Sequence, residues 1–63
     1  MNRQEYNRKI ISKLNKIVEE YPDLRFGQIL WNYGILYWED NKYRVHDPHS
    51  DESRDIWNRM NKF

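Results

Sequence analysis

Cysteine is absent from this 63-residue chain, which excludes disulfide bonds and thiolate zinc sites. A chain this short forms one domain, residues 1–63, and buries only ~60% of the surface that its unfolded state exposes. Without those cross-links, a few large side chains must supply the stability of the fold. Three tryptophans, five tyrosines and two phenylalanines are available for this purpose. The lack of cysteine also fits a reducing cytosol.

A charge excess of one sign and long apolar runs are missing as well. Eleven basic and ten acidic residues leave a net charge of +1, which excludes a non-specific polyanion binder, and the aromatic content excludes a disordered chain. No apolar run approaches the ~20 residues of a membrane span. The first residues, MNRQEYNRKIISKL, contain no apolar segment of the signal-peptide kind. We therefore expect a cytoplasmic protein with no membrane contact.

Apolar residues recur at helical spacing near the N-terminus and predict an amphipathic helix over 2–21. The stripe consists of Tyr6, Ile10, Leu14, Ile17 and Tyr21, widened by Ile11 and Val18. Asn2, followed three residues later by Glu5, predicts an N-cap. Pro22 predicts the end of this helix, because a residue that precedes proline is displaced from the α region.

A second helix is predicted over 24–33, with Asp23 as its N-cap and Gly34 as a left-handed residue just beyond its end. Gly27 falls in the middle of the apolar side of this helix. Glycine costs ~1 kcal/mol relative to alanine inside a helix. We therefore expect the first helix to cross closely at Gly27, where no Cβ would fit.

Residues 35–46 change character and predict a short hairpin in which 35–39 pair with 42–46. Asp40 and Asn41 would form a tight turn with both residues at positive φ. The alternative is that the second helix continues through Glu39.

A third helix is predicted over 51–62, and Ser50 is the expected cap. Acidic residues lie near its start and basic residues near its end, as the helix dipole favours. These residues are Asp51, Glu52, Arg59 and Lys62. A narrow apolar stripe on this helix can cover the first two helices, and it consists of Ile56, Trp57, Met60 and Phe63. The predicted fold class is mostly α, with a small α+β fold as the alternative.

Two segments resemble a family of short uncharacterised bacterial and phage-borne proteins. Residues 21–28, YPDLRFGQ, fit its first motif, and the Asp-Pro-x-x-x-Glu-Ser pattern of residues 47–53 fits the second, which precedes a last helix. His49 stands where that family has an aromatic residue, and the insert at 37–45 is longer than usual. The resemblance covers roughly half of the chain. It implies a grouping by fold and no activity, and it is compatible with a phage or mobile-element accessory role.

Arg25, Gln28 and Asn32 share one face of the second helix. Arginine reads guanine edges and phosphates, and glutamine and asparagine read adenine, so the set suits the recognition helix of a helix-turn-helix protein. The alternative is a solvated face in which Arg25 pairs with Asp23 and Gln28 bonds to a loop. The short length and the near-neutral charge favour this alternative.

Lys9, Lys13 and Lys16 form a basic stripe on the first helix. Such a stripe can contact nucleic acid or an acidic protein. The alternative is that these lysines form the solvated side of the helix.

Trp31 and Trp38 are candidate anchors of a protein interface, since ten aromatic residues can hardly all be interior in so short a chain. The alternative is a compact core that contains every tryptophan.

Four potential metal ligands lie close together in the sequence: His46, Asp47, His49 and Asp51. Pro48 interrupts them, so a turn and a helix start explain them better than a metal site. The chain contains no phosphate-cradling glycine loop and no nucleophile–base pair. We expect no metal, no cofactor, no enzymatic activity and no small-molecule substrate. The sequence predicts a module that binds a protein partner or a second copy of itself, with a small nucleic-acid binder as the alternative.

Overall fold

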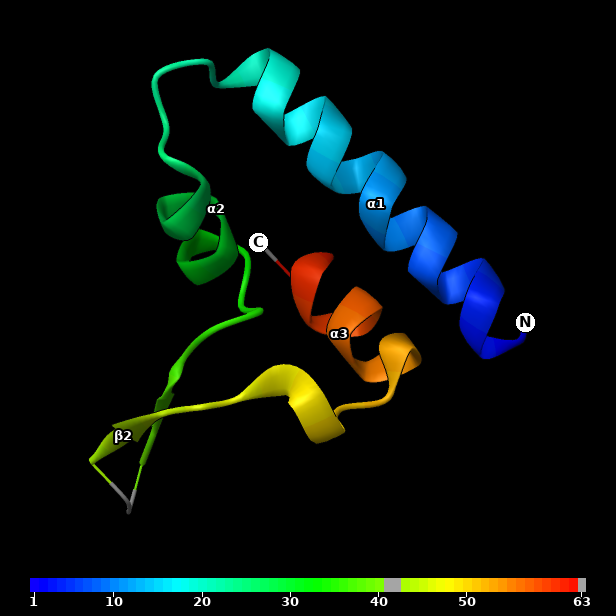
Figure 1. Ribbon diagram of the computed structural model, residues 1–63, viewed down its shortest axis with the longest axis vertical. Helices are drawn as coiled ribbons and strands as arrows, with labels where there is room; N and C mark the ends of the chain where they lie inside the picture. Colours follow the sequence, from blue (N-terminus) through cyan, green and yellow to red (C-terminus); the bar gives the residue numbers. More distant parts are fainter. Residues whose placement is uncertain (41–42, 63) are drawn as a thin grey trace.

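A computed structural model describes residues 1–40 and 43–62 of the chain. These residues form three α-helices, a two-stranded antiparallel hairpin and a 3₁₀ turn (Figure 1). In chain order the elements are α1 (Arg3–Glu20), α2 (Phe26–Asn32), β1 (Trp38–Glu39), β2 (Arg44–Val45), η1 (Pro48–Ser50) and α3 (Ser53–Met60). The prediction of a mostly α fold with a small β component is confirmed.

The first helix begins and ends as its sequence predicts. Asn2 is its N-cap, because the Asn2 Oδ1 atom accepts a hydrogen bond of 2.9 Å from the Glu5 N–H group. The helix ends at Glu20, two residues before Pro22. The predicted widening of its apolar stripe is wrong, since the side chain of Ile11 is 67% exposed and that of Val18 is 44% exposed.

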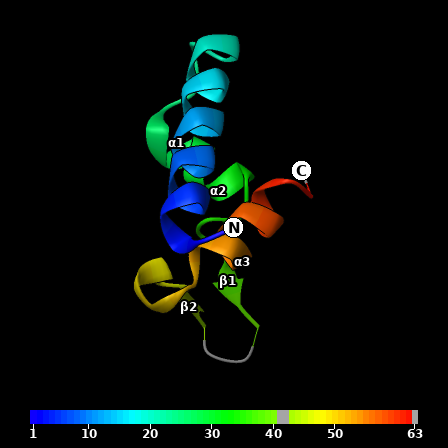
Figure 2. The same cartoon turned by 90° about the vertical axis from the view of Figure 1, so that its right-hand side faces the viewer.

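Helix α3 packs beside α1 and runs in the same direction (Figures 1 and 2). Three polar contacts join the two helices at successive positions along their length. They join Arg3 to Glu52, Asn7 to Ser53, and Lys13 to Asn61. The side of α1 that lies between Asn7 and Lys13 on a helical wheel therefore faces α3. Ile11 and Val18 lie outside that side, which accounts for their exposure.

The third helix starts later than predicted. Ser50 belongs to η1 and does not cap α3, and the backbone of both Asp51 and Glu52 is extended. Glu52 is the N-cap residue of α3. The physical reason is that the Asp51 carboxylate is bound by His46 and Arg59 and is not available to the first turn of the helix.

The described core is small and lies where the three helices meet. It consists of Ile17 from α1, Ile29 from α2, Ile35 from the following loop and Met60 from α3. The molecule measures 34 × 32 × 18 Å, and its radius of gyration is 12.1 Å. A compact domain of this length is expected to have a radius of about 10.6 Å. The flat, open shape explains why so few side chains are fully buried.

The second helix starts at Phe26, so the prediction that Asp23 caps it is wrong. Asp23 lies in a turn that is closed by a hydrogen bond of 3.1 Å from the Leu24 N–H group to the Tyr21 carbonyl oxygen. Arg25 is the N-cap residue, and its N–H group donates to Gln28 Oε1 at 2.8 Å. The Gln28 side chain thus accepts a hydrogen bond from the N–H group of the N-cap residue itself.

The close helix crossing predicted at Gly27 is also wrong. Gly27 is exposed, and a Cβ atom added to it would meet no atom within 4 Å. The buried side of α2 is centred on Ile29, which is 1% exposed, and on the adjacent Tyr33. At 100° per residue Gly27 lies well away from that side.

Gly34 ends α2 as predicted. Its φ angle is 78°, in the left-handed region that glycine adopts without a Cβ penalty. The Ile35 N–H group donates to the Leu30 carbonyl oxygen at 3.0 Å, and the Gly34 N–H group donates to that of Trp31 at 3.3 Å. These bonds form a Schellman motif. The alternative in which α2 continues through Glu39 is therefore excluded.

The hairpin is shorter than predicted, and its register differs. Trp38 lies opposite Val45, and Glu39 opposite Arg44. The His46 N–H group extends this register by donating to the Tyr37 carbonyl oxygen at 2.7 Å. The connection is thus four residues long, and the predicted two-residue turn is wrong. The positive φ angle falls on Tyr43, at 50°, while Asn41 lies outside the described residues.

Candidate functional site

The hairpin presents two different faces, because side chains alternate along a strand and opposite residues share a face. Trp38 and Val45 lie opposite each other and are both exposed. The other face carries Tyr37, Glu39 and His46, together with Arg44. This second face is turned toward α3, as the contacts described below show.

Trp31, Trp38 and Val45 form what we call the aromatic patch. The rings of Trp31 and Trp38 meet edge to face, with centroids 5.9 Å apart and an interplanar angle of 84°. The two side chains are 40% and 60% exposed. The prediction that some tryptophans are at the surface is confirmed, and the alternative of one core containing all of them is wrong.

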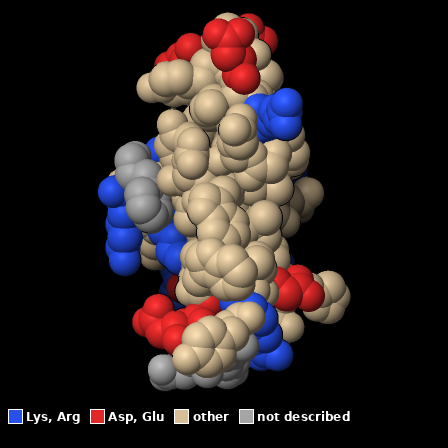
Figure 3. Space-filling view, turned by 90° about the vertical axis from the view of Figure 1, so that its left-hand side faces the viewer, with Lys and Arg blue, Asp and Glu red and all other residues tan. Residues whose placement is uncertain are grey.

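The side of the molecule formed by α2 and the hairpin is largely uncharged. Figure 3 shows this side with a broad area of uncharged residues in the middle, acidic residues near both ends, and basic residues along one edge and at the lower end. An uncharged aromatic surface with a charged rim has the composition of the centre of a protein interface. This side is therefore the first candidate site.

The inner face of the hairpin is fastened to α3 by a cluster that we call the hairpin latch, consisting of His46, Asp51 and Arg59. Asp51 Oδ2 lies 2.8 Å from His46 Nε2 and 2.8 Å from Arg59 Nη2. Arg59 Nε donates to the Gly34 carbonyl oxygen, also at 2.8 Å. The His46 ring stacks on Tyr37 at 4.5 Å, and the Arg59 guanidinium lies over the same tyrosine.

The latch sets the ionisation of Asp51. Partial burial alone would raise the pKa of this carboxyl group, but the hydrogen bonds from His46 and Arg59 outweigh it and lower the pKa below the ordinary value of 3.8. The carboxylate form is therefore favoured in the fold. The role of the latch that these contacts explain is structural: they hold the hairpin against α3.

The residues of the predicted recognition face are not arranged as on the recognition helix of a helix-turn-helix protein. Arg25, Gln28 and Asn32 are exposed, but Gln28 Oε1 is engaged by the Arg25 N–H group. Arg25 itself precedes the helix as its N-cap, and α2 is only 7 residues long. None of these three residues lines the pocket that gathers the lysines of α1, which is described next.

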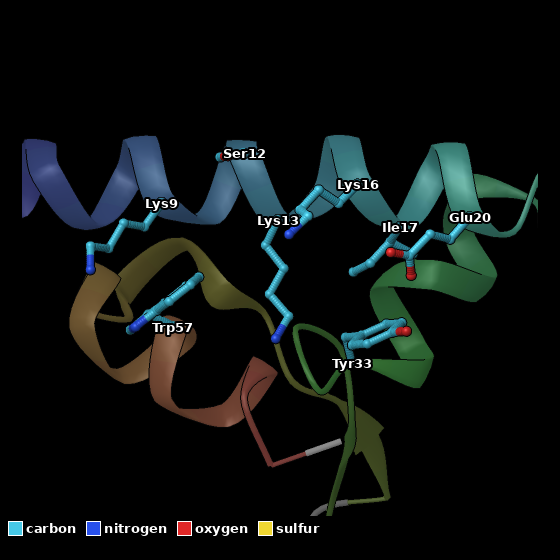
Figure 4. Close-up of a pocket in the computed structure, with 8 residues that line it drawn as sticks. All are labelled: Lys9, Ser12, Lys13, Lys16, Ile17, Glu20, Tyr33 and Trp57. Atoms are coloured by element: carbon cyan, nitrogen blue, oxygen red, sulfur yellow. The ribbon is translucent and has the colours of Figure 1, made fainter.

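The lysines of α1 line a pocket between the three helices (Figure 4). Lys9 Nζ and Lys13 Nζ lie 5.6 and 5.7 Å from the centroid of the Trp57 ring. Lys13 Nζ also donates to Asn61 Oδ1 at 2.8 Å. The pocket has a volume of about 490 Å³, and Ser12, Lys16, Ile17, Glu20 and Tyr33 complete its lining. The basic stripe is therefore turned toward α3 and α2.

The potential metal ligands serve the backbone and the latch. Asp47 Oδ1 accepts from the His49 N–H group at 2.9 Å and caps η1. His46 and Asp51 bind each other. Within residues 1–40 and 43–62, no group of three or more histidine or carboxylate side chains is arranged to hold a metal ion.

Two features of the site could not be read from the sequence. The pocket depends on Trp57, which belongs to the predicted apolar stripe of the third helix, and on Tyr33, the last residue of the predicted second helix. Neither carries a spacing signal for a pocket. The latch depends on Arg59, whose place near the end of a helix suggested only a dipole contact. The single sequence signal was the basic stripe itself, since Lys13 lies beside the apolar stripe that contains Leu14 and Ile17.

No protein-family model, no curated protein and no solved structure matches this chain. The family resemblance of the YPDLRFGQ segment thus stays a prediction. None of the helices in the described part of the chain has the length and apolar character needed to cross a membrane.

Proposed function

We propose that this chain is a cytoplasmic protein-interaction module whose aromatic patch binds another protein or a second copy of the same chain. The observation that carries this proposal is the exposed edge-to-face pair of Trp31 and Trp38, held in place by two different elements. Tryptophan is among the residues that contribute most to binding when a partner covers it.

The shape of the molecule supports the need for a partner. Its accessible surface is 5126 Å², whereas a monomeric protein of 8.0 kDa is expected to expose about 4,450 Å². Large apolar side chains contribute to this surface on several elements. A standard protein interface covers ~800 Å² on each partner, so a complex of ordinary size would remove this excess.

The patch is also preorganised. Trp38 is fixed in the hairpin by its pairing with Val45, and the hairpin is fixed to α3 by the latch. Rigid aromatic side chains lose little conformational entropy on binding. The patch can therefore act as an anchor without further folding.

The test begins with sedimentation velocity of the purified chain over a range of concentrations. Affinity capture follows, with the wild-type chain, Trp38→Ser and Tyr21→Ser as baits. Tyr21 is a matched control because it is an aromatic residue, 49% exposed, in the connection between α1 and α2. Self-association or a captured protein that is lost only with Trp38→Ser supports the proposal. Capture that is equal for all three baits, with no self-association, contradicts it.

A further inference from the structure

The pocket between α1, α2 and α3 gathers the ammonium groups of Lys9, Lys13 and Lys16, and Glu20 also belongs to its lining. Across residues 1–40 and 43–62, the ion pairs involve arginines and His46, and none of them includes Lys9, Lys13 or Lys16. Like charges three or four positions apart repel each other on a helix. An anion placed among these ammonium groups would offset that repulsion.

The pocket also has the size and the flat surfaces that a ring-bearing ligand requires. Its volume of about 490 Å³ lies within the range of ~300–1,000 Å³ that is typical of small-molecule sites. Trp57 stands on α3, and Tyr33 follows α2. Aromatic side chains of this kind stack against nucleobases, whichever base is bound.

The two ends of the pocket lining carry charges of opposite sign. Lys9 and Trp57 lie at one end, and Glu20 lies at the other, next to Tyr33 (Figure 4). Lys9 and Glu20 are eleven positions apart on the helix, or about 16.5 Å along its axis. The Glu20 carboxylate repels a second anionic group and accepts hydrogen bonds from hydroxyl or amino groups. The matching ligand therefore has an anion at one end and hydrogen-bond donors at the other.

We propose that this pocket binds a small phosphate monoester that carries a flat ring and hydroxyl groups, of the nucleoside monophosphate class. The phosphate lies among the ammonium groups of Lys9, Lys13 and Lys16, the ribose with its hydroxyl groups lies in the middle of the pocket, and the base lies against Tyr33 with its amino group toward Glu20. The site shares no residue with the aromatic patch, so the ligand-binding proposal and the protein-interface proposal can be tested independently. It also departs from the prediction that the chain takes no small-molecule substrate, although binding alone implies no reaction.

The test is a titration of the full chain with adenosine monophosphate, followed by the NMR signal of the Trp57 indole N–H group. Ribose 5-phosphate, adenosine and inorganic sulfate are titrated in parallel. We expect saturable binding of adenosine monophosphate, with at least a tenfold weaker affinity for each of the other three probes. Lys9→Gln and Lys16→Gln should each weaken binding by about tenfold or more.

Arg8→Gln is the matched control, because it removes one positive charge from the same helix outside the pocket. It should change the affinity by less than about twofold. Lys13 is left in place because its bond to Asn61 holds α1 and α3 together. The amide spectrum of each variant shows whether it is folded, and Lys16→Gln removes no hydrogen bond described in the fold. Equal loss with Arg8→Gln, sulfate binding as tight as that of adenosine monophosphate, or no saturation overturns the proposal.

Discussion

Arg59 ties the last helix to the loop after α2, because its Nε atom donates to the Gly34 carbonyl oxygen at 2.8 Å. The same guanidinium binds Asp51 through Nη2, also at 2.8 Å. One side chain therefore joins α3 both to the loop after α2, 25 positions earlier, and to the segment that precedes α3. Because the apolar core is so small, we infer that this cluster contributes a large share of the stability of the fold.

Replacing Arg59 by methionine should lower the free energy of unfolding by about 2–3 kcal/mol, because charge-assisted hydrogen bonds to partly buried groups are lost. Arg54→Met is the matched control, since Arg54 is exposed and pairs only loosely with its neighbour Asp55, at 3.8 Å. Its effect should stay within about 0.5 kcal/mol. Urea denaturation of both variants measures the difference. Equal midpoints would show that the latch does not stabilise the fold.

The latch should also make the fold sensitive to acid. The pKa of Asp51 is lowered below 3.8 in the fold, so the stabilisation from its carboxylate is complete above the unfolded pKa and is lost as the pH falls through the folded pKa. Asp51→Asn should be less stable than the wild type at neutral pH and should lose less stability below pH 3.8. Thermal unfolding between neutral pH and strong acid measures this change. Asp55→Asn, which alters an exposed carboxylate, should keep the acid response of the wild type; the same response in Asp51→Asn would contradict the assignment.

The two glycines should respond to alanine in opposite ways. Gly27→Ala should stabilise the domain by up to about 1 kcal/mol, because the added Cβ meets open space and alanine favours the helix. Gly34→Ala should destabilise it by about 1–2 kcal/mol, since its φ angle is 78°. Melting temperatures of the two variants provide the measurement. A loss of stability in Gly27→Ala would restore the close crossing that the sequence suggested.

Nucleic-acid binding should be weak and should disappear at moderate salt. Gln28 is engaged in the cap of α2, and the net charge of the chain is only +1. The lysines of α1 line a pocket between the helices, so a nucleic-acid backbone can contact few basic side chains in succession. Each phosphate contact of a true binder would add a slope of about −0.9 to the dependence of log K on log salt. Titration of labelled duplex and single-stranded oligonucleotides at two salt concentrations decides this point. Submicromolar, sequence-dependent binding that is lost with Arg25→Ala would favour the recognition-helix alternative.

Local signals in the sequence predicted the elements well. The Asn2 cap, the stop before Pro22 and the left-handed Gly34 each depend on the chemistry of a few neighbouring residues, and all three are present in the structure. The hairpin was predicted for the same reason, since its strand residues alternate. Its register was missed because the connection is two residues longer than the turn that the sequence suggested.

Tertiary relationships were predicted less well. The buried side of α2 was misplaced because Ile29 lies near the polar residues on a helical wheel, and only the packing of α1 and α3 decides which side is covered. The role of Arg59 depends on its distance from Gly34, which is 25 positions earlier in the chain. Of the two candidate sites, one could be predicted from the sequence and the other could not. The exposed pair of Trp31 and Trp38 could be anticipated from the excess of aromatic residues, whereas the pocket needed the position of Trp57.

The decisive quantity is the dissociation constant of the complex found by capture or by self-association. It is measured for the wild type, Trp38→Ser and Tyr21→Ser. Trp38→Ser should raise the dissociation constant about 30-fold or more, because a covered aromatic anchor contributes ~2 kcal/mol or more. Tyr21→Ser should leave it within about twofold of the wild-type value. Amide spectra confirm that both variants are folded. Equal dissociation constants for the wild type and a folded Trp38→Ser variant would contradict binding through the aromatic patch.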